Sequence, residues 1–346
     1  MPTVEREDRV VRVENISHAP HSNILHVSWT IDRFCNYSCS YCWKNAHSPV
    51  RNGLPTEVLT AGYHRIRRAA SKNGRSSFVW VMAGGEATLH PGFMVLASEM
   101  ADDVCNTDHS SLRLASNMSN GKRWWDGFSA VLRRFDDPNV SASWHREQAG
   151  DIKAFAAKCS DLVSNGIRCN VTIVMDPAMF DQLADDALHL HSIGLSVHVR
   201  TMRDPISSRV VHYSDDQLRY LSETTLSRDY GLKTIGRTMR TTSFEESPGS
   251  QLRLTHANGT ESYLLHPDHL GAIGLTMFQG WTCDAGRTSI VVTESGEIRR
   301  GWGCGDKRLG NISGEFSLLR DAAVCVSRIG CACSHDLAIP KFRKFI

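Results

Sequence analysis

Short runs of β-branched and aromatic residues alternate along most of this chain with longer stretches whose apolar residues recur at helical spacing. Between residues 24 and 200 this alternation predicts six strands with amphipathic helices between them. The predicted strands are residues 24–30, 77–82, 112–116, 139–144, 168–174 and 195–200. Regular alternation of strand and helix is typical of a parallel sheet covered by helices, so the pattern predicts the α/β class.

The spacing of these strands limits how the sheet can close. The starts of the last four predicted strands lie 27 to 29 residues apart, which is the length of one strand, one helix and two turns. Six such units are too few to close an eight-stranded barrel, so we expect an open, partial (β/α)6 barrel of the TIM type. In sheets of this kind, ligands bind at the carboxyl ends of the strands.

The pattern changes after about residue 228, where short β-rich segments replace the strand and helix units. Asn258-Gly259 predicts the turn of one hairpin, and Ser295-Gly296 predicts the turn of another. The chain is therefore predicted to have three parts. They are an N-terminal extension at 1–23, the partial barrel at 24–228, and a linker with β-hairpins and a small cysteine-bearing domain at 229–346.

Composition and charge add little that is specific. The 346 residues are 41% hydrophobic and 22% charged, with a net charge of +2, which is ordinary for a globular protein. The sequence has no run of about 18 apolar residues that would predict a membrane span. Its charged start, MPTVEREDRVVRVEN, lacks the apolar core of a signal peptide. We therefore expect a cytoplasmic protein without a membrane partner, and no basic aromatic patch favours nucleic acid.

The cysteines change this picture, because they fall into groups. The chain has 11 of them, an odd number, and reduced cytoplasmic cysteines serve as metal ligands more often than as a disulfide framework. Three lie at 35–42 and five at 283–333. The other three, Cys105, Cys159 and Cys169, are predicted to be small buried hydrophobic residues.

The first group is the motif CNYSCSYCW, which places Cys35, Cys39 and Cys42 directly after the first predicted strand. Three thiolates cannot close a tetrahedral zinc site, so a distant cysteine or histidine would have to complete one. An iron-sulfur cubane is the alternative. Three thiolates then leave one iron open, where a substrate or cofactor can bind.

This motif, taken with MAGGEATLHP after the second strand, resembles the radical S-adenosylmethionine superfamily, and the resemblance covers roughly residues 24 to 200. It implies a four-iron four-sulfur cluster on the three cysteines, with S-adenosylmethionine on the open iron. It also implies reductive cleavage of that cofactor to a 5′-deoxyadenosyl radical, which abstracts hydrogen from the substrate. The chemistry would belong to the cofactor, and the protein would position it and exclude water.

The resemblance assigns cofactor binding to seven residues, namely Tyr41, Gly84, Gly85, Glu86, Asn117, Ser143 and Val174. Tyr41 would lie near the adenine, and Val174 would contact it through its backbone. The two glycines would let the backbone approach the methionine, whose ammonium Glu86 would bind. Asn117 and Ser143 would hold the carboxylate and the ribose. The alternatives are packing for Tyr41, a simple turn at Gly-Gly-Glu, and helix capping by Asn117 or Ser143.

The end of the fourth predicted strand, SWHREQ, departs from the small acidic turn that is commoner in the family. His145, Glu147 and Arg200 are the predicted catalytic residues, and Arg146 and His198 would lie near them at the mouth of the barrel. Such groups would suit a polar substrate with carboxylate or phosphate groups. The alternative is that each is a solvated rim residue.

The second cysteine group resembles the auxiliary-cluster extension, of SPASM or twitch type, that follows the barrel in some members of this superfamily. Its five cysteines are Cys283, Cys304, Cys325, Cys331 and Cys333. Two fully ligated cubanes would need seven or eight thiolates, so we expect one auxiliary cluster. Cys283, Cys304, Cys331 and Cys333 are the preferred ligands, and Cys325 is the alternative to either of the last two. A zinc ribbon on the same sulfurs is the other option.

These features predict a radical S-adenosylmethionine oxidoreductase or isomerase with two clusters. We expect it to oxidise or epimerise a small polar substrate, such as a sugar, nucleotide or amino-acid derivative, and to take electrons from a donor such as flavodoxin or ferredoxin. One alternative is a maturase of a ribosomally made peptide, although the residues before position 24 are few for a separate peptide-binding domain. Another is a redox-sensing or scaffold protein whose clusters only hold structure.

Overall fold

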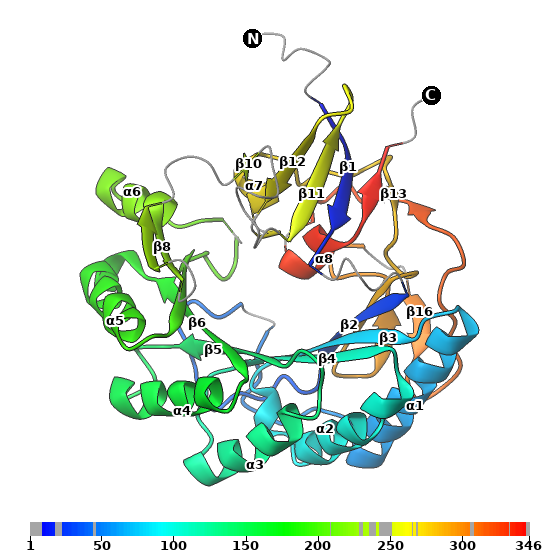
Figure 1. The fold of residues 1–346 in the computed structure, drawn as a ribbon, viewed down its shortest axis with the longest axis horizontal. Helices are drawn as coiled ribbons and strands as arrows, with labels where there is room; N and C mark the ends of the chain where they lie inside the picture. The colour runs from blue at the N-terminus through cyan, green and yellow to red at the C-terminus, as the bar shows by residue number, and fades with distance from the viewer. Residues whose placement is uncertain are drawn as a thin grey trace.

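The structure is a computed structural model, and the residues it describes form two β-sheets with helices around them (Figure 1). The described residues are 9–17, 23–43, 46–207, 209–227, 231–234, 240–241, 251–264, 266–267, 269–304, 308–331 and 333–343.

Six parallel strands form the centre of the larger sheet. They are β2 (Ile24–Thr30), β3 (Ser77–Ala83), β4 (His109–Ser116), β5 (Asn139–Trp144), β6 (Arg168–Met175) and β7 (Ser196–Thr201). All six match predicted strands, so the predicted α/β partial barrel is confirmed. Strand β4 begins earlier than expected because Ser110 and Ser111 are buried with partners: Ser110 N donates to Asp136 at 2.6 Å, and Ser111 Oγ donates to the carbonyl of Asp137 at 2.6 Å.

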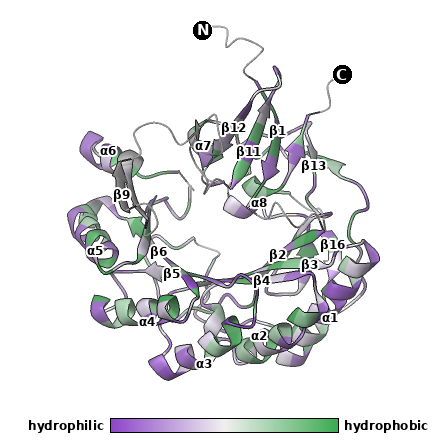
Figure 2. Cartoon of the chain, viewed as in Figure 1, coloured by the Kyte–Doolittle hydropathy of each residue, from purple (hydrophilic) through white to green (hydrophobic). Residues whose placement is uncertain are grey.

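Helices cover the outer face of this sheet (Figure 1). They are α1 (Thr56–Lys72), α2 (Phe93–Asp102), α3 (Lys122–Leu132), α4 (Ile152–Ser164) and α5 (Phe180–Ser192), with 3-10 turns at Ala87–Leu89, Val104–Asn106 and Pro177–Met179. Helix α4 begins and ends at residues that are typical of helix boundaries. Asp151 caps its N-terminus by accepting a hydrogen bond from Lys153 N at 2.8 Å, and Gly166, with φ +78°, follows its C-terminus. Figure 2 shows hydrophobic residues on the helix faces toward the sheet.

The main core fills the space between the parallel sheet and the helices. Its largest fully buried side chains include Trp29, Trp80, Tyr63, Phe93 and Phe128. Ring pairs such as Tyr63 and Trp80, with centroids 5.2 Å apart and planes tilted by 57°, fill this space with aromatic contacts. The core therefore fixes the sheet from its convex side.

Strands from the end of the chain extend the larger sheet at one edge. Strand β14 (Ser289–Val292) pairs in parallel with β2, and β15 (Glu297–Arg299) and β16 (Arg308–Asn311) follow antiparallel. The predicted hairpin with its turn at Ser295-Gly296 is confirmed, and it is part of the barrel sheet. At the other edge β8 (Thr224–Ser227) and β9 (Gly231–Thr234) add an antiparallel pair after α6 (Asp215–Glu223) that the sequence did not predict.

The second sheet combines both ends of the chain. Its order is β10 (Arg240–Thr241), β12 (Glu261–Leu264), β11 (Leu252–His256), β1 (Val10–Asn15), β18 (Lys341–Phe342), β13 (Thr282–Cys283) and β17 (Ala323–Val324). The hairpin of β11 and β12 confirms the predicted turn at Asn258-Gly259. Two short helices, α7 (His269–Ala272) and α8 (Ser334–Ala338), accompany this sheet, which lies across from the concave side of the parallel strands (Figure 1).

Within the described part of the chain, no helix is both long and apolar enough to cross a membrane.

Candidate active site and cysteine centres

One cavity of about 1250 Å³ lies where the carboxyl ends of the parallel strands face the second sheet. Cys35, Cys39 and Cys42 line one part of it, and Cys331 and Cys333 line another. The two cysteine groups, far apart in sequence, therefore border the same space.

Most of the predicted site residues meet at this cavity. Its lining includes Tyr41, Gly84, Gly85, Asn117, Ser143, His145, Val174 and Arg200, and it includes neither Glu86 nor Glu147. The strand ends bring these residues together, because parallel strands of similar length end at the same edge of the sheet.

The loop of the first cysteine group is held by its own hydrogen bonds. Asp32 is 1% exposed, and its Oδ1 accepts from Phe34 N at 3.0 Å and from Asn52 N at 3.2 Å. Cys35 N donates to the carbonyl of Ser48 at 3.2 Å, so the two arms of the loop lie side by side. The cysteines thus sit on a closed loop with a fixed base.

Gly84 and Gly85 pack directly against this loop. Gly84 has φ +142°, and a Cβ there would lie 2.1 Å from the carbonyl oxygen of Asp32. A Cβ at Gly85 would lie 2.3 Å from the carbonyl oxygens of Arg33 and Phe34. Both positions therefore require glycine for the close approach of two backbones.

Glu86, the expected acceptor for the methionine ammonium, is a buried carboxylate with hydrogen bonds at both oxygens. It is 1% exposed; Oε1 accepts from Ser116 Oγ at 2.9 Å and from Thr88, and Oε2 accepts from Asn117 N at 2.6 Å. Burial raises the pKa of Glu86 despite these donors. The Asn117 side chain in turn donates to Asn36 Oδ1 at 3.0 Å, which links the end of β4 to the cysteine loop.

The segment after β5, residues 145–148, forms what we call the clamp segment, because three of its side chains bind the cysteine loop. His145 Nδ1 lies 2.8 Å from the Tyr41 hydroxyl. Ser40 N donates to Glu147 Oε1 at 2.7 Å, and Ser38 N donates to Gln148 Oε1 at 3.3 Å. The segment after the fourth predicted strand therefore holds the cysteine loop, a role that the sequence did not predict.

Arg146, the remaining residue of the clamp segment, makes its contacts elsewhere. Its Nη1 lies 2.7 Å from both carboxylate oxygens of Asp186, which also accepts from Trp144 Nε1 at 2.8 Å. The sequence predicts Arg146 at the mouth of the barrel, but in the structure it forms an ion pair with Asp186 of α5.

Tyr41 and His145 form a neutral pair at the cavity. Their rings stack with centroids 5.9 Å apart and an interplanar angle of 22°. Burial lowers the pKa of His145 to about 4 and raises that of Tyr41. Tyr41 is therefore oriented by His145 as well as by the backbone of the cysteine loop.

Another part of the cavity lining, which we call the basic wall, is rich in basic side chains. His198, Arg200 and Arg203 come from β7 and the loop after it, and His266 and His269 come from the side of the second sheet. The rings of His198 and His266 lie 5.4 Å apart. Among the described residues that line the cavity there is no aspartate or glutamate.

The donor set of the first group fits an iron-sulfur cluster. Burial is the main cause that raises the pKa of the Cys39 thiol to about 12, with Glu147 and the other two cysteines adding to it. Among the described residues no three His, Cys, Asp or Glu side chains converge closely enough for one metal ion. A cubane spreads its thiolates over separate irons, so three soft ligands around a cavity suit it better than a single zinc ion.

In the second group, Cys283 lies in β13 and Cys325 follows β17, while Cys331 and Cys333 precede α8 and Cys304 follows β15. Cys304 packs against Cys283, and Cys325 N donates to the carbonyl of Trp281 at 2.7 Å. Burial raises the pKa of Cys331 to about 11 and is the main cause that raises those of Cys304 and Cys333 to about 12. Cys283 influences Cys304 and Cys331 electrostatically, and Cys331 influences Cys333, so these thiols are neighbours that suit one cluster with four thiolate ligands.

Two buried residues that the sequence reasoning missed organise this second group. Asp336 accepts from Trp302 N at 3.0 Å and from Gly303 N at 2.6 Å, which holds the loop of Cys304 beside α8. Lys341 pairs with Cys283 across strands β18 and β13. Neither residue has a signal in the local sequence, since an Asp or a Lys is normally exposed.

The three scattered cysteines are only partly as predicted. Cys159 and Cys169 are buried, whereas Cys105 is exposed, so its predicted burial is wrong. Cys105 follows the end of α2, where its thiol donates to the carbonyl of Asp102 at 3.6 Å.

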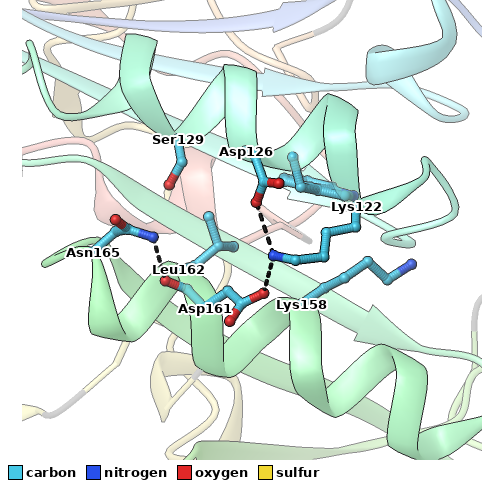
Figure 3. A pocket seen from close by; sticks show the side chains of 8 residues that line it. Lys122, Asp126, Ser129, Lys158, Asp161, Leu162 and Asn165 are labelled. Atoms are coloured by element: carbon cyan, nitrogen blue, oxygen red, sulfur yellow. Dashed lines mark hydrogen bonds and ion pairs between the residues drawn. The ribbon is translucent and has the colours of Figure 1, made fainter.

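A second, much smaller hollow lies between α3 and α4 (Figure 3). It holds only about 10 Å³, and Lys122 Nζ bridges Asp126 at 3.0 Å and Asp161 at 2.6 Å across it. A space of this size holds about one water molecule, so it is a gap in the packing of the two helices and is too small for a ligand.

Comparison with protein-family models gives no match, and comparison with curated proteins gives none either. Solved structures do match. Hexahistidine-tagged anSMEcpe with bound AdoMet is 16% identical over 84% of this chain and 78% of that chain, with a TM-score of 0.53. Native anSMEcpe with bound AdoMet is 15% identical over 84% and 79%, with a TM-score of 0.52. Native anSMEcpe with bound AdoMet and Cp18Cys peptide is 14% identical over 85% and 79%, with a TM-score of 0.51. The chain therefore has the fold of these AdoMet-bound proteins.

Proposed function

We propose that this chain is a radical S-adenosylmethionine enzyme with one auxiliary iron-sulfur cluster. One observation carries the proposal: Cys35, Cys39 and Cys42 border a cavity together with the glycine pair and the strand ends that the family uses for the cofactor. The shared fold with AdoMet-bound structures supports it.

The residues that would hold the first cluster and its cofactor are those that line this cavity. The three cysteines would be the thiolate ligands, and Gly84, Gly85, Asn117, Ser143, Val174 and Tyr41 would bind S-adenosylmethionine. When bound, these groups would supply a 5′-deoxyadenosyl radical that takes a hydrogen atom from the substrate. Glu86 would act from behind the pocket, since its carboxylate fixes Asn117.

The substrate class we favour is a peptide segment. The cavity of about 1250 Å³ would hold the first cluster and S-adenosylmethionine and leave the rest of its space for a substrate. One of the solved structures with this fold is described with a bound peptide. The chain would then be a maturase, in which the cavity receives an extended segment and the radical modifies one residue of it.

A small polar metabolite with a carboxylate or phosphate group is the second candidate substrate. The basic wall favours it, because Arg200 and His198 reach the cavity from β7 and no described lining residue is acidic. The basic wall is compatible with either oxidation or epimerisation of such a metabolite. His145 and Glu147 would then contribute by orienting Tyr41 and the cysteine loop.

The test is anaerobic reconstitution followed by iron and sulfide analysis and an assay for 5′-deoxyadenosine. We expect about eight irons per chain, from two clusters of four, and 5′-deoxyadenosine after addition of S-adenosylmethionine and a reductant. Changing Cys35, Cys39 and Cys42 to Ala should remove about half the iron and all cleavage. Bound zinc in place of iron, or no cleavage by the intact protein, would refute the proposal.

The same preparation separates the two substrate classes. Deuterium from labelled peptides or from labelled small metabolites would appear in 5′-deoxyadenosine only when the true substrate is present. Cys283→Ala with Cys304→Ala should spare the first cluster, and full iron content in that variant would refute the auxiliary site. A flavodoxin or ferredoxin as electron donor and a cytoplasmic location stay predictions from the sequence.

A further inference from the structure

Lys341 is a buried lysine placed directly beside the second cysteine group. It is 1% exposed and is the cross-strand partner of Cys283 in the antiparallel pair of β18 and β13. Directly opposed residues of such a pair project to the same face with Cβ atoms about 5 Å apart. The lysine side chain and the thiol therefore start from neighbouring points on one face of the sheet.

The hydrogen bonds of Lys341 occupy three donors, the number that an ammonium group has. Its Nζ donates to the carbonyl oxygens of Asp336 at 2.6 Å, Ile339 at 2.7 Å and Leu337 at 3.3 Å. An ammonium group has three N–H donors, whereas a neutral amine has two and would point a lone pair at one carbonyl. The three acceptors therefore match the charged form, and the ring of Phe278, with its centroid 4.7 Å from Nζ, adds a cation–π contact.

No hydrogen bond of this charge, in the part of the chain that the structure describes, reaches a carboxylate. Among the described residues its hydrogen-bond partners are carbonyl oxygens, and the Asp336 carboxylate accepts from the backbone of Trp302 and Gly303 instead. A second cation, Arg300, is also buried nearby, with Nε on the carbonyl of Ala285 at 2.9 Å. Burying cations is costly unless negative charge is present; the buried Asp336 carboxylate supplies one such charge in this region, and thiolates with an iron-sulfur cluster would provide more.

We propose that Lys341 is a positioning residue of the auxiliary centre, whose fixed positive charge raises the reduction potential of the cluster bound through Cys283. One-electron reduction adds a negative charge to the cluster, and a cation in the same low-dielectric region stabilises that reduced form more than the oxidised form. This inference rests on the auxiliary cluster of the proposed function.

The two clusters that border the cavity would therefore differ in the charges around them and in how readily they accept an electron. The described charged side chains near the first cysteine group are the carboxylates of Glu147 and Glu86. Those near the second group are the cations Lys341 and Arg300 together with the Asp336 carboxylate, so positive charge predominates there. The auxiliary cluster would therefore be the better electron acceptor of the two. Its role would be to take up an electron and not to cleave S-adenosylmethionine.

The experiment is a redox titration of the reconstituted full chain, followed by electron paramagnetic resonance, with dithionite as the reductant. The test variant is Lys341→Met, which keeps the length and apolar stem and removes the charge. Lys341→Arg is the conservative variant, and Lys122→Met, at a lysine with 65% of its side chain exposed, is the matched control. The first cluster of each sample serves as an internal reference.

We expect Lys341→Met to make one-electron reduction of the auxiliary cluster at least tenfold less favourable, which is a fall of about 59 mV or more in its midpoint potential. The first cluster should not shift, and Lys341→Arg and Lys122→Met should match the wild type. An unchanged auxiliary potential in Lys341→Met at full iron content would overturn the inference.

Loss of the auxiliary iron in Lys341→Met would be resolved with Lys341→Gln, which retains N–H donors without the charge. Retention of the cluster in Lys341→Arg with its loss or a lowered potential in Lys341→Gln supports the role of the charge. Loss of the cluster in Lys341→Arg as well would refute it, because shape and not charge would then be required. A wild-type protein without iron on the second cysteine group would instead refute the auxiliary part of the proposed function.

Discussion

Glu147 accepts a hydrogen bond from the backbone N–H of Ser40 at 2.7 Å, so a side chain at the end of β5 holds the loop between two cysteines of the first group. The two residues are 107 positions apart in the chain. The contact lies at the surface, where water competes for both groups, but the backbone N–H that it fixes belongs to the residue next to Cys39. The clamp segment therefore acts on the geometry of the first cluster.

Glu147→Ala should release iron from the first cluster faster than the wild type. A hydrogen bond of this kind contributes about 0.5–1.5 kcal/mol, which corresponds to about a two- to tenfold faster release to a chelator. Glu147→Gln keeps an acceptor oxygen and should stay near the wild-type rate. Glu315→Ala, at an exposed glutamate remote in sequence from both cysteine groups, is the control. Equal release rates for Glu147→Ala and the control would contradict the clamp.

Gly84→Ala should prevent the cysteine loop from docking. The added Cβ would lie 2.1 Å from a backbone oxygen of Asp32, at a position with φ +142°, and no side-chain rotation relieves either problem. Iron analysis should show about half the wild-type content, because the second cysteine group is unaffected. Gly127→Ala, in α3 with open space at its Cβ, should keep all the iron and stabilise the fold by about 0.5–1 kcal/mol. Full iron content in Gly84→Ala would show that the loop can dock without the glycine.

Glu86→Gln should change how stability depends on pH. Burial raises the pKa of Glu86 in the folded protein, so the folded state binds a proton more tightly than the unfolded state. The contribution of this group is fully present below the unfolded pKa and is lost as the pH rises through the folded pKa. The free energy of unfolding of the wild type, relative to Glu86→Gln, should therefore fall as the pH rises from about 4.5. Urea denaturation of the metal-free wild type and Glu86→Gln across this pH range measures the difference in unfolding free energy. A difference that instead grows in favour of the wild type as the pH rises would contradict the raised pKa of Glu86.

Ile290→Ala should destabilise the barrel although this residue lies in the last fifth of the chain. Ile290 is 0% exposed and pairs with Val27 of β2 through the parallel contact of β14. Truncation of a buried isoleucine costs about 2–5 kcal/mol of unfolding free energy. Ile206→Ala, at a side chain that is 80% exposed, should cost less than about 0.5 kcal/mol. Similar denaturation midpoints for the two variants would mean that β14 contributes little to the barrel core.

The sequence alone determined the parts of this protein that depend on neighbouring residues. The six parallel strands follow from local periodicity, the two hairpins follow from Asn258-Gly259 and Ser295-Gly296, and the grouping of the cysteines is visible as spacing. The cysteine motif with Gly84 and Gly85 also predicted a fold that the solved structures share. In each case the information lies within a few residues or in a known motif.

The tertiary structure alone decided which distant segments meet. It placed β14 beside β2, joined β1 to β18 and β11, brought the clamp segment onto the cysteine loop, and set Lys341 opposite Cys283. These contacts join residues that are often more than about 100 positions apart, and local periodicity carries no record of them. The reason is physical: strand and helix patterns report which face of an element is buried, whereas the partner on that face is chosen only when the whole core packs.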